Sequence, residues 1–177
     1  ATARACTPTT VMASASTAGG MLAVMGLDEA RVSALRELAA EDGVLVLALH
    51  NGPTQFVLSG CHRALKRFKV LADASGAKEC VLLDVSHAFH SPLMGAIVDD
   101  WRSVVDGLDL ARPRYPMLLN TTARTVVGVD CIRRSLIAQI TTPVLWTHCV
   151  RALVGMGITD LIEVGDSKVV GALARRI

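Results

Sequence analysis

The chain has 177 residues, of which 51% are hydrophobic and 19% are charged, so we expect a packed core rather than a disordered chain. Basic and acidic residues number 18 and 16, and this balance provides no basic face for a nucleic acid backbone. No apolar run reaches the roughly 18 to 20 residues that a membrane-spanning helix needs. We therefore expect neither a nucleic acid nor a membrane as a partner.

The five cysteines are odd in number and form no Cys-x-x-Cys pair. We therefore expect no disulfide framework and no zinc site, and we interpret Cys80, in an apolar run, as a core residue. The first 20 residues lack the charged segment and continuous apolar stretch of a secretory signal. Because reduced thiols are the rule in the cytoplasm, we expect a cytoplasmic protein. The first residue is not methionine, which suggests that upstream sequence is missing.

Residues 20–86 alternate short apolar runs with amphipathic segments in the order strand, helix, strand, strand, helix, strand. The strands are expected over 21–25, 44–49, 55–60 and 80–85. One helix is expected between a capping Asp28 and a closing Gly43, and the other over 64–74. This is the order of a ferredoxin-like βαββαβ unit, in which two helices cover one face of a small antiparallel sheet.

The pattern changes after residue 86. Ser91-Pro92 predicts a helix start, because a hydroxyl cap is followed by proline at the first helical position. Further strands are expected over 117–120 and 159–165, and further helices over 131–141, 145–156 and from 168 onward. Strands that alternate with helices are typical of part of a parallel sheet, so the fold class is α/β.

His90 is the most informative candidate for chemistry, because it lies between a strand-like run and a helix cap. A histidine there faces a cleft from a rigid position, and the positive end of the helix dipole favours its neutral form. That suits a general base acting on a hydroxyl nucleophile, although a histidine that only hydrogen-bonds a loop would fit the same pattern. His87 lies three residues earlier, but no acidic residue is placed to complete a metal site with it.

Five segments of the chain resemble, in the same order, malonyl-CoA:acyl carrier protein transacylases and the acyltransferase domains of polyketide synthases. The segments are 20–27, 51–55, 86–94, 139–146 and 163–169. Within 86–94, the sequence His-Ala-Phe-His resembles the form of the motif that is associated with malonyl rather than methylmalonyl selectivity.

The resemblance implies three parts. Residues 1–19 would end an upstream segment of the large subdomain, 20–86 would form a ferredoxin-like small subdomain, and 87–177 would form the C-terminal part of an α/β-hydrolase-like large subdomain. The implied reaction moves a malonyl group from CoA to the phosphopantetheine thiol of an acyl carrier protein by a Ser–His ping-pong mechanism. It implies no metal and no cofactor, because the phosphopantetheine is carried by the partner. Such a reaction belongs to fatty acid or polyketide biosynthesis, in a stand-alone enzyme or a multidomain synthase.

The resemblance also implies roles for single residues. His90 would take the proton of the serine, and Gln139 would offer its backbone carbonyl to the imidazole ring. His87 and Phe89 would shape the acyl pocket, since a bulky Phe89 leaves little room for an α-methyl branch. Asn51 would line the entrance, although a plain turn residue needs no function.

The sequence departs from the family pattern in several places. No Gly-x-Ser-x-Gly occurs, so we expect the nucleophile upstream and no activity from the isolated chain. Pro8 stands where the family carries a carboxylate-binding arginine, with Arg4 out of register, and Asp166-Ser167 replaces a Pro-Gly pair. Two hypotheses remain: part of an acyltransferase, or a degenerate, non-catalytic scaffold or docking module.

An acyl carrier protein is acidic and would approach a basic surface. Four basic residues on the helix expected over 64–74, or just before it, are candidates for that surface, although an ordinary solvated face explains them equally: Arg63, Lys66, Arg67 and Lys69.

Overall fold

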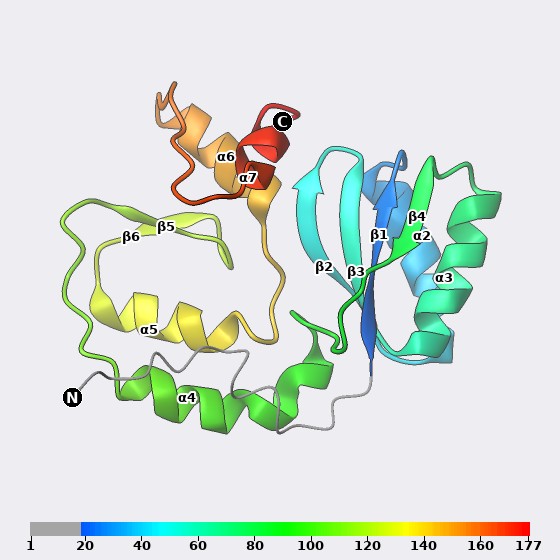
Figure 1. Cartoon of the computed structure of the whole chain (residues 1–177), viewed down its shortest axis with the longest axis horizontal. Helices are drawn as coiled ribbons and strands as arrows, with labels where there is room; N and C mark the ends of the chain where they lie inside the picture. Colours follow the sequence, from blue (N-terminus) through cyan, green and yellow to red (C-terminus); the bar gives the residue numbers. More distant parts are fainter. Residues whose placement is uncertain (1–18) are drawn as a thin grey trace.

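The computed structural model describes residues 19–177, which form a mixed α/β structure (Figure 1). The departures from the family pattern at Arg4 and Pro8 lie outside the described residues, as does nearly all of the segment 1–19. In the part that the structure describes, no helix is long and apolar enough to cross a membrane.

The first half contains the expected order of strands and helices. The elements are β1 (Gly20–Met25), α2 (Glu29–Ala39), a 3-10 turn η1 (Ala40–Asp42), β2 (Leu45–Gly52), β3 (Gln55–Gly60), α3 (His62–Ala74) and β4 (Glu79–Leu82). The strands lie in the order β2-β3-β1-β4, and each neighbouring pair is antiparallel. Figure 1 shows α2 and α3 together beside this sheet.

The core between the helices and the sheet follows from the amphipathic pattern. Asp28 caps α2 as predicted, and its carboxylate accepts a hydrogen bond from the Arg31 amide at 2.8 Å. The buried faces of α2 and α3 meet apolar residues of the strands, with Phe68 and Leu22 fully buried at the centre. Cys80 is a core residue, as predicted, and burial raises the pKa of its thiol to about 11.

The second half contains more helices than strands. Its elements are a 3-10 helix η2 (Pro92–Ile97), α4 (Val98–Asp106), β5 (Met117–Leu119), β6 (Arg124–Val126), α5 (Val129–Ala138), α6 (Trp146–Gly155) and α7 (Val169–Ala174). The helix start at Ser91-Pro92 is confirmed, because the Ser91 hydroxyl accepts from the Leu93 amide. Each predicted helix is present with bounds shifted by a few residues.

The strands of residues 19–177 form no parallel sheet with one another. The strand predicted over 117–120 is present as β5, but it pairs antiparallel with β6 in a two-stranded hairpin. The strand predicted over 159–165 is absent, and that segment is irregular, with Ile162 86% and Val164 93% exposed. A strand exists through backbone hydrogen bonds to a neighbour, and no described strand lies beside this segment.

A short backbone bridge is one of the contacts between the two halves. The Val144 amide donates to the Ala48 carbonyl at 2.8 Å, and the His50 amide donates to the Val144 carbonyl at 3.0 Å. These bonds form an isolated parallel bridge between Leu49 on β2 and Val144, just before α6. The bridge positions the segment after α5 against the edge of the sheet.

Candidate active site

His90 lies in the connection between β4 and η2, and its backbone is unusual. Its φ angle is +58°, in the left-handed region that costs a residue with a side chain roughly 1–2 kcal/mol. The next residue, Ser91, is fully buried, and its hydroxyl donates to the Ala88 carbonyl at 2.6 Å. Ser91 therefore holds the backbone on both sides of His90, through the Ala88 carbonyl and the Leu93 amide.

The His90 ring is partly buried, and one of its nitrogens is fixed. Nδ1 lies 2.8 Å from the backbone carbonyl oxygen of Gln139, although 49 residues separate the two in sequence. A carbonyl oxygen only accepts hydrogen bonds, so Nδ1 carries the hydrogen. In the neutral ring, Nε2 then has a free lone pair and can accept a proton from a hydroxyl or a thiol.

Gln139 is the C-terminal cap of α5, where carbonyl groups lack partners within the helix. It offers its backbone, and its amide side chain makes no hydrogen bond with any residue of the described part of the chain. The contact between His90 and Gln139 is the one that the family resemblance implied.

His87 and Phe89 lie on the same loop as His90. Their ring centroids are 5.9 Å apart, and His87 Nδ1 lies 2.7 Å from the Ser86 hydroxyl. Phe89 is half-buried and packs both against the sheet, near Met21, and against the cluster that contains α4. The loop thus places two rings next to His90 in sequence, with Phe89 fixed by packing.

Asn51 is not brought into hydrogen-bond contact with this loop. It lies on β2 near the turn to β3, and among residues 19–177 its side chain bonds to none of His87, Phe89 and His90. Asp166 and Ser167 are exposed, and the Ser167 hydroxyl accepts a hydrogen bond from the Val169 amide at 3.2 Å.

A second group of titratable side chains lies where α2, β2 and α6 meet. His50 Nδ1 is 3.7 Å from the Glu29 carboxylate, and the His50 and His148 rings pack edge to face with centroids 5.4 Å apart. Burial lowers the pKa of His50; Glu29 opposes this effect and His148 adds to it. No sequence motif predicts this group, because its members come from three separate elements.

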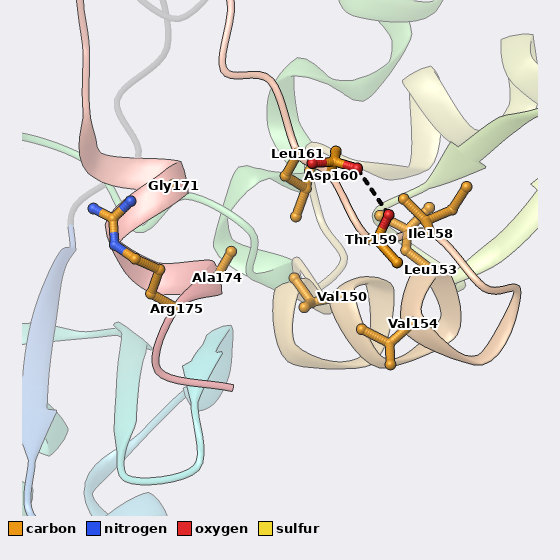
Figure 2. A pocket seen from close by; sticks show the side chains of 10 residues that line it. All are labelled: Val150, Leu153, Val154, Ile158, Thr159, Asp160, Leu161, Gly171, Ala174 and Arg175. Atoms are coloured by element: carbon orange, nitrogen blue, oxygen red, sulfur yellow. Dashed lines mark hydrogen bonds between the residues drawn. The ribbon is translucent and has the colours of Figure 1, made fainter.

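Figure 2 shows a cavity of about 330 Å³ between α6 and α7. Its lining is mainly apolar, from Val150 and Leu153 to Leu161, with a hydrogen bond between Thr159 and Asp160 at one side. None of the predicted site residues lines it. The cavity borders the segment that was expected to be a strand, and we assign it no chemistry.

The candidate basic surface on α3 is largely neutralised. Arg67 pairs with Glu41 and Asp42, Arg63 pairs with Asp42, and Lys69 pairs with Asp73. Three of the four cations therefore have acidic partners nearby, which favours the interpretation of an ordinary solvated face.

Comparison with known proteins gives consistent results. The model of the family described as "Acyl transferase domain" matches residues 1–166. The malonyl CoA-acyl carrier protein transacylase of Bacillus subtilis is 32% identical over 160 residues, which cover 90% of this chain and 50% of that protein. The polyketide biosynthesis protein ThaF of Burkholderia thailandensis is 36% identical over 164 residues, 93% of this chain and 14% of that protein.

Solved structures agree with the sequence comparisons. The acyl-carrier-protein S-malonyltransferase of Burkholderia pseudomallei has a TM-score of 0.89 and 32% identity, over 94% of this chain and 54% of that one. A malonyl-transacylase solved in complex with a type II polyketide synthase acyl-carrier protein has a TM-score of 0.86 and 28% identity, over 93% of this chain and 53% of that one. The chain spans about half the length of the curated transacylases that it matches. With nearly its whole length matched, the chain belongs to the acyl transferase domain family.

Proposed function

We propose that this chain forms the histidine-bearing part of an acyltransferase, which moves a malonyl or related acyl group from CoA to the phosphopantetheine thiol of an acyl carrier protein. The observation that carries the proposal is the hydrogen bond from His90 Nδ1 to the Gln139 carbonyl, which leaves Nε2 free to accept a proton. The names of the relatives support the same acyl group and the same acceptor.

The first half of the reaction needs a hydroxyl nucleophile from outside these 177 residues, because no Gly-x-Ser-x-Gly occurs in the sequence. His90 Nε2 takes the proton of that serine as its oxygen attacks the thioester carbonyl. The tetrahedral intermediate then expels the CoA sulfur, which receives the proton from His90. The products are an acyl-serine ester and free CoA thiol.

The second half reverses the roles. His90 Nε2 takes the proton of the carrier's phosphopantetheine thiol, and the sulfur attacks the acyl-serine ester. The serine oxygen leaves and recovers its proton from His90, so the enzyme returns to its starting state. No metal or other cofactor takes part in these steps.

The fold around His90 supports its role. The antiparallel order β2-β3-β1-β4, with α2 and α3 packed together, supports a ferredoxin-like small subdomain for residues 20–86. Residues 87–177 would complete an α/β-hydrolase-like large subdomain whose further strands are supplied elsewhere. Phe89 and His87 would form one wall of the acyl pocket, and Asn51 would line its entrance.

Labelled malonyl-CoA tests the proposal. In the complete protein, we expect an acyl ester on a serine outside this chain, located by mass spectrometry of quenched samples. The isolated chain should take up no label, and a stable ester on one of its own serines would contradict the missing nucleophile. A complete protein that takes up no label would favour the scaffold or docking module, which the substitutions at Pro8, Asp166 and Ser167 also suggest.

A further inference from the structure

Two backbone carbonyls at the end of α5 accept hydrogen bonds from side chains of residues 90–101. The indole Nε1 of Trp101 donates to the Leu136 carbonyl at 2.8 Å, and His90 Nδ1 donates to the Gln139 carbonyl at 2.8 Å. The last carbonyls of a helix lack partners within the helix, so side chains from elsewhere are free to bind them. Leu136 and Gln139 are three residues apart and point along the same side of α5.

The two donors lie on one continuous segment of the chain, with His90 directly before the helical part and Trp101 within it. Ser91 caps η2, and η2 runs directly into α4, where Trp101 lies on the helix. Figure 1 shows α4 and α5 stacked along each other. Trp101 is 8% exposed and packs with Met94, Ile97 and Ile140, so its indole has little freedom to move.

We propose that Trp101 is a positioning residue for His90: its indole N–H fixes the last turn of α5, so that the Gln139 carbonyl stays within hydrogen-bond reach of His90 Nδ1. The inference rests on the proposed function and adds a residue to the same site. Trp101 touches neither substrate nor reacting atoms, and acts through Leu136 and Gln139.

The hydrogen bonds of Arg133 also join α5 to the region of α4, but they lie farther from Gln139. Arg133 on α5 donates to the carbonyls of Val105 and Leu108, at the end of α4 that is remote from His90. Arg133 precedes Gln139 by six residues, or roughly 9 Å along the helix, whereas Leu136 precedes it by about one turn. A rotation of α5 about the Arg133 contact would therefore displace Gln139, and the Trp101 bond opposes that rotation.

The position of the His90 ring depends on its hydrogen bond to the Gln139 carbonyl. The left-handed backbone conformation of His90 is strained, so the ring is held by the structure around it rather than by a local preference. If the Gln139 carbonyl moves away, Nδ1 loses its acceptor, and the proton can occupy either ring nitrogen. The ring with hydrogen on Nε2 cannot accept a proton there.

Trp101→Phe tests the proposal, because phenylalanine keeps an aromatic ring in the core and removes the N–H. The matched control is Trp146→Phe, since the buried Trp146 Nε1 has no hydrogen-bond partner among residues 19–177. The reporter is the His90 side chain in ¹⁵N-edited NMR spectra of the 177-residue chain, assigned with His90→Gln. We expect one tautomer and a slowly exchanging Nδ1–H in the native chain and in Trp146→Phe.

In Trp101→Phe, we expect mixed tautomers and Nδ1–H exchange about 3- to 10-fold faster, the range that the loss of one hydrogen bond allows. In the complete protein the same variant should lower kcat by a similar factor and leave KM for malonyl-CoA unchanged. A variant that melts at a lower temperature but keeps the native His90 spectrum would overturn the proposal and make Trp101 an ordinary core residue.

Two further outcomes are distinguishable. If Trp101→Phe does not fold, benzothienylalanine at position 101, in the Trp146→Phe background, keeps the shape of the indole without its N–H and gives the same readout. The His90 spectrum does not depend on acyl transfer. A changed spectrum with unchanged kcat would therefore count against the proposed function of His90, and an unchanged spectrum against the role of Trp101.

Discussion

Replacing Ser91 by alanine removes a hydroxyl that serves the backbone on both sides of His90. The hydroxyl is fully buried, accepts from the Leu93 amide at 3.3 Å, and donates to the Ala88 carbonyl at 2.6 Å. Ala88 is itself fully buried, so water cannot replace the lost donor. The substitution therefore removes a helix cap and leaves a buried carbonyl without a partner.

The expected cost follows from these two losses. Removal of a serine cap costs about 1 kcal/mol, and a buried carbonyl left without a donor costs roughly 1–3 kcal/mol. We expect Ser91→Ala to lower the free energy of unfolding by about 2–4 kcal/mol, a large fraction of the stability of a domain of this size. His90, held in a left-handed conformation next to Ser91, should lose its fixed orientation as well.

Urea denaturation of the 177-residue chain, followed by circular dichroism, measures this cost. Ser103→Ala is the matched control, because the Ser103 hydroxyl also donates to a backbone carbonyl, that of Asp99 at 3.0 Å, but on the exposed side of α4. The control should change stability by less than about 0.5 kcal/mol. Equal losses in the two variants would refute the role assigned to the buried hydroxyl.

Two further predictions concern the sheet and its neighbours. The pKa of His50 is lowered from its ordinary 6.5, chiefly by burial, so the unfolded chain binds the proton more readily and stability should fall as the pH drops through 6.5 and below. His50→Gln should make stability, measured by urea denaturation between pH 5 and 8, less dependent on pH, and an unchanged dependence would contradict the buried neutral ring. A Cβ on Gly60 would lie 2.1 Å from the Val44 carbonyl oxygen, so Gly60→Ala should shift the β2–β3 pairing and cost several kcal/mol. Gly95→Ala, with nothing within 4 Å of its Cβ, should leave the melting temperature nearly unchanged, and similar melting temperatures for the two variants would argue against this close approach.

The sequence predicted the first half of the fold well, because its signals are local. Asp28 marks a helix start, and apolar residues such as Leu65 and Phe68 recur at helical spacing. The order of elements over 20–86 then left few ways to bury both helices on one sheet. In this half, the apolar residues that the local pattern assigns to the core are the ones that pack together in it.

The second half was predicted less well, because strands depend on partners that a sequence does not reveal. The residues over 159–165 have the composition of a buried strand, yet they remain irregular without a neighbouring strand. Similarly, β5 was identified as a strand, but its antiparallel partner β6 was missed, since Arg124 and Thr125 give only a weak strand signal.

The sequence likewise predicts one part of the candidate site and not the other. The motif around His90 could be identified from sequence, and the resemblance implied its contact with Gln139. Two other features could not be identified from sequence, because each depends on how distant segments pack. They are the left-handed conformation of His90 and the hydrogen bond from Trp101 to Leu136. A tryptophan at helical spacing predicts a core residue and says nothing about its N–H.

In the proposed reaction, His90 removes the proton of a serine supplied outside this chain. The most direct measurement is the rate of acyl-serine formation in the complete protein, followed by rapid quench after mixing with labelled malonyl-CoA. His90→Gln should slow this step by about two to three decades, whereas His62→Gln, at the exposed start of α3, should leave it unchanged. Acyl-serine formation at the native rate in His90→Gln would contradict the role of His90 as the base.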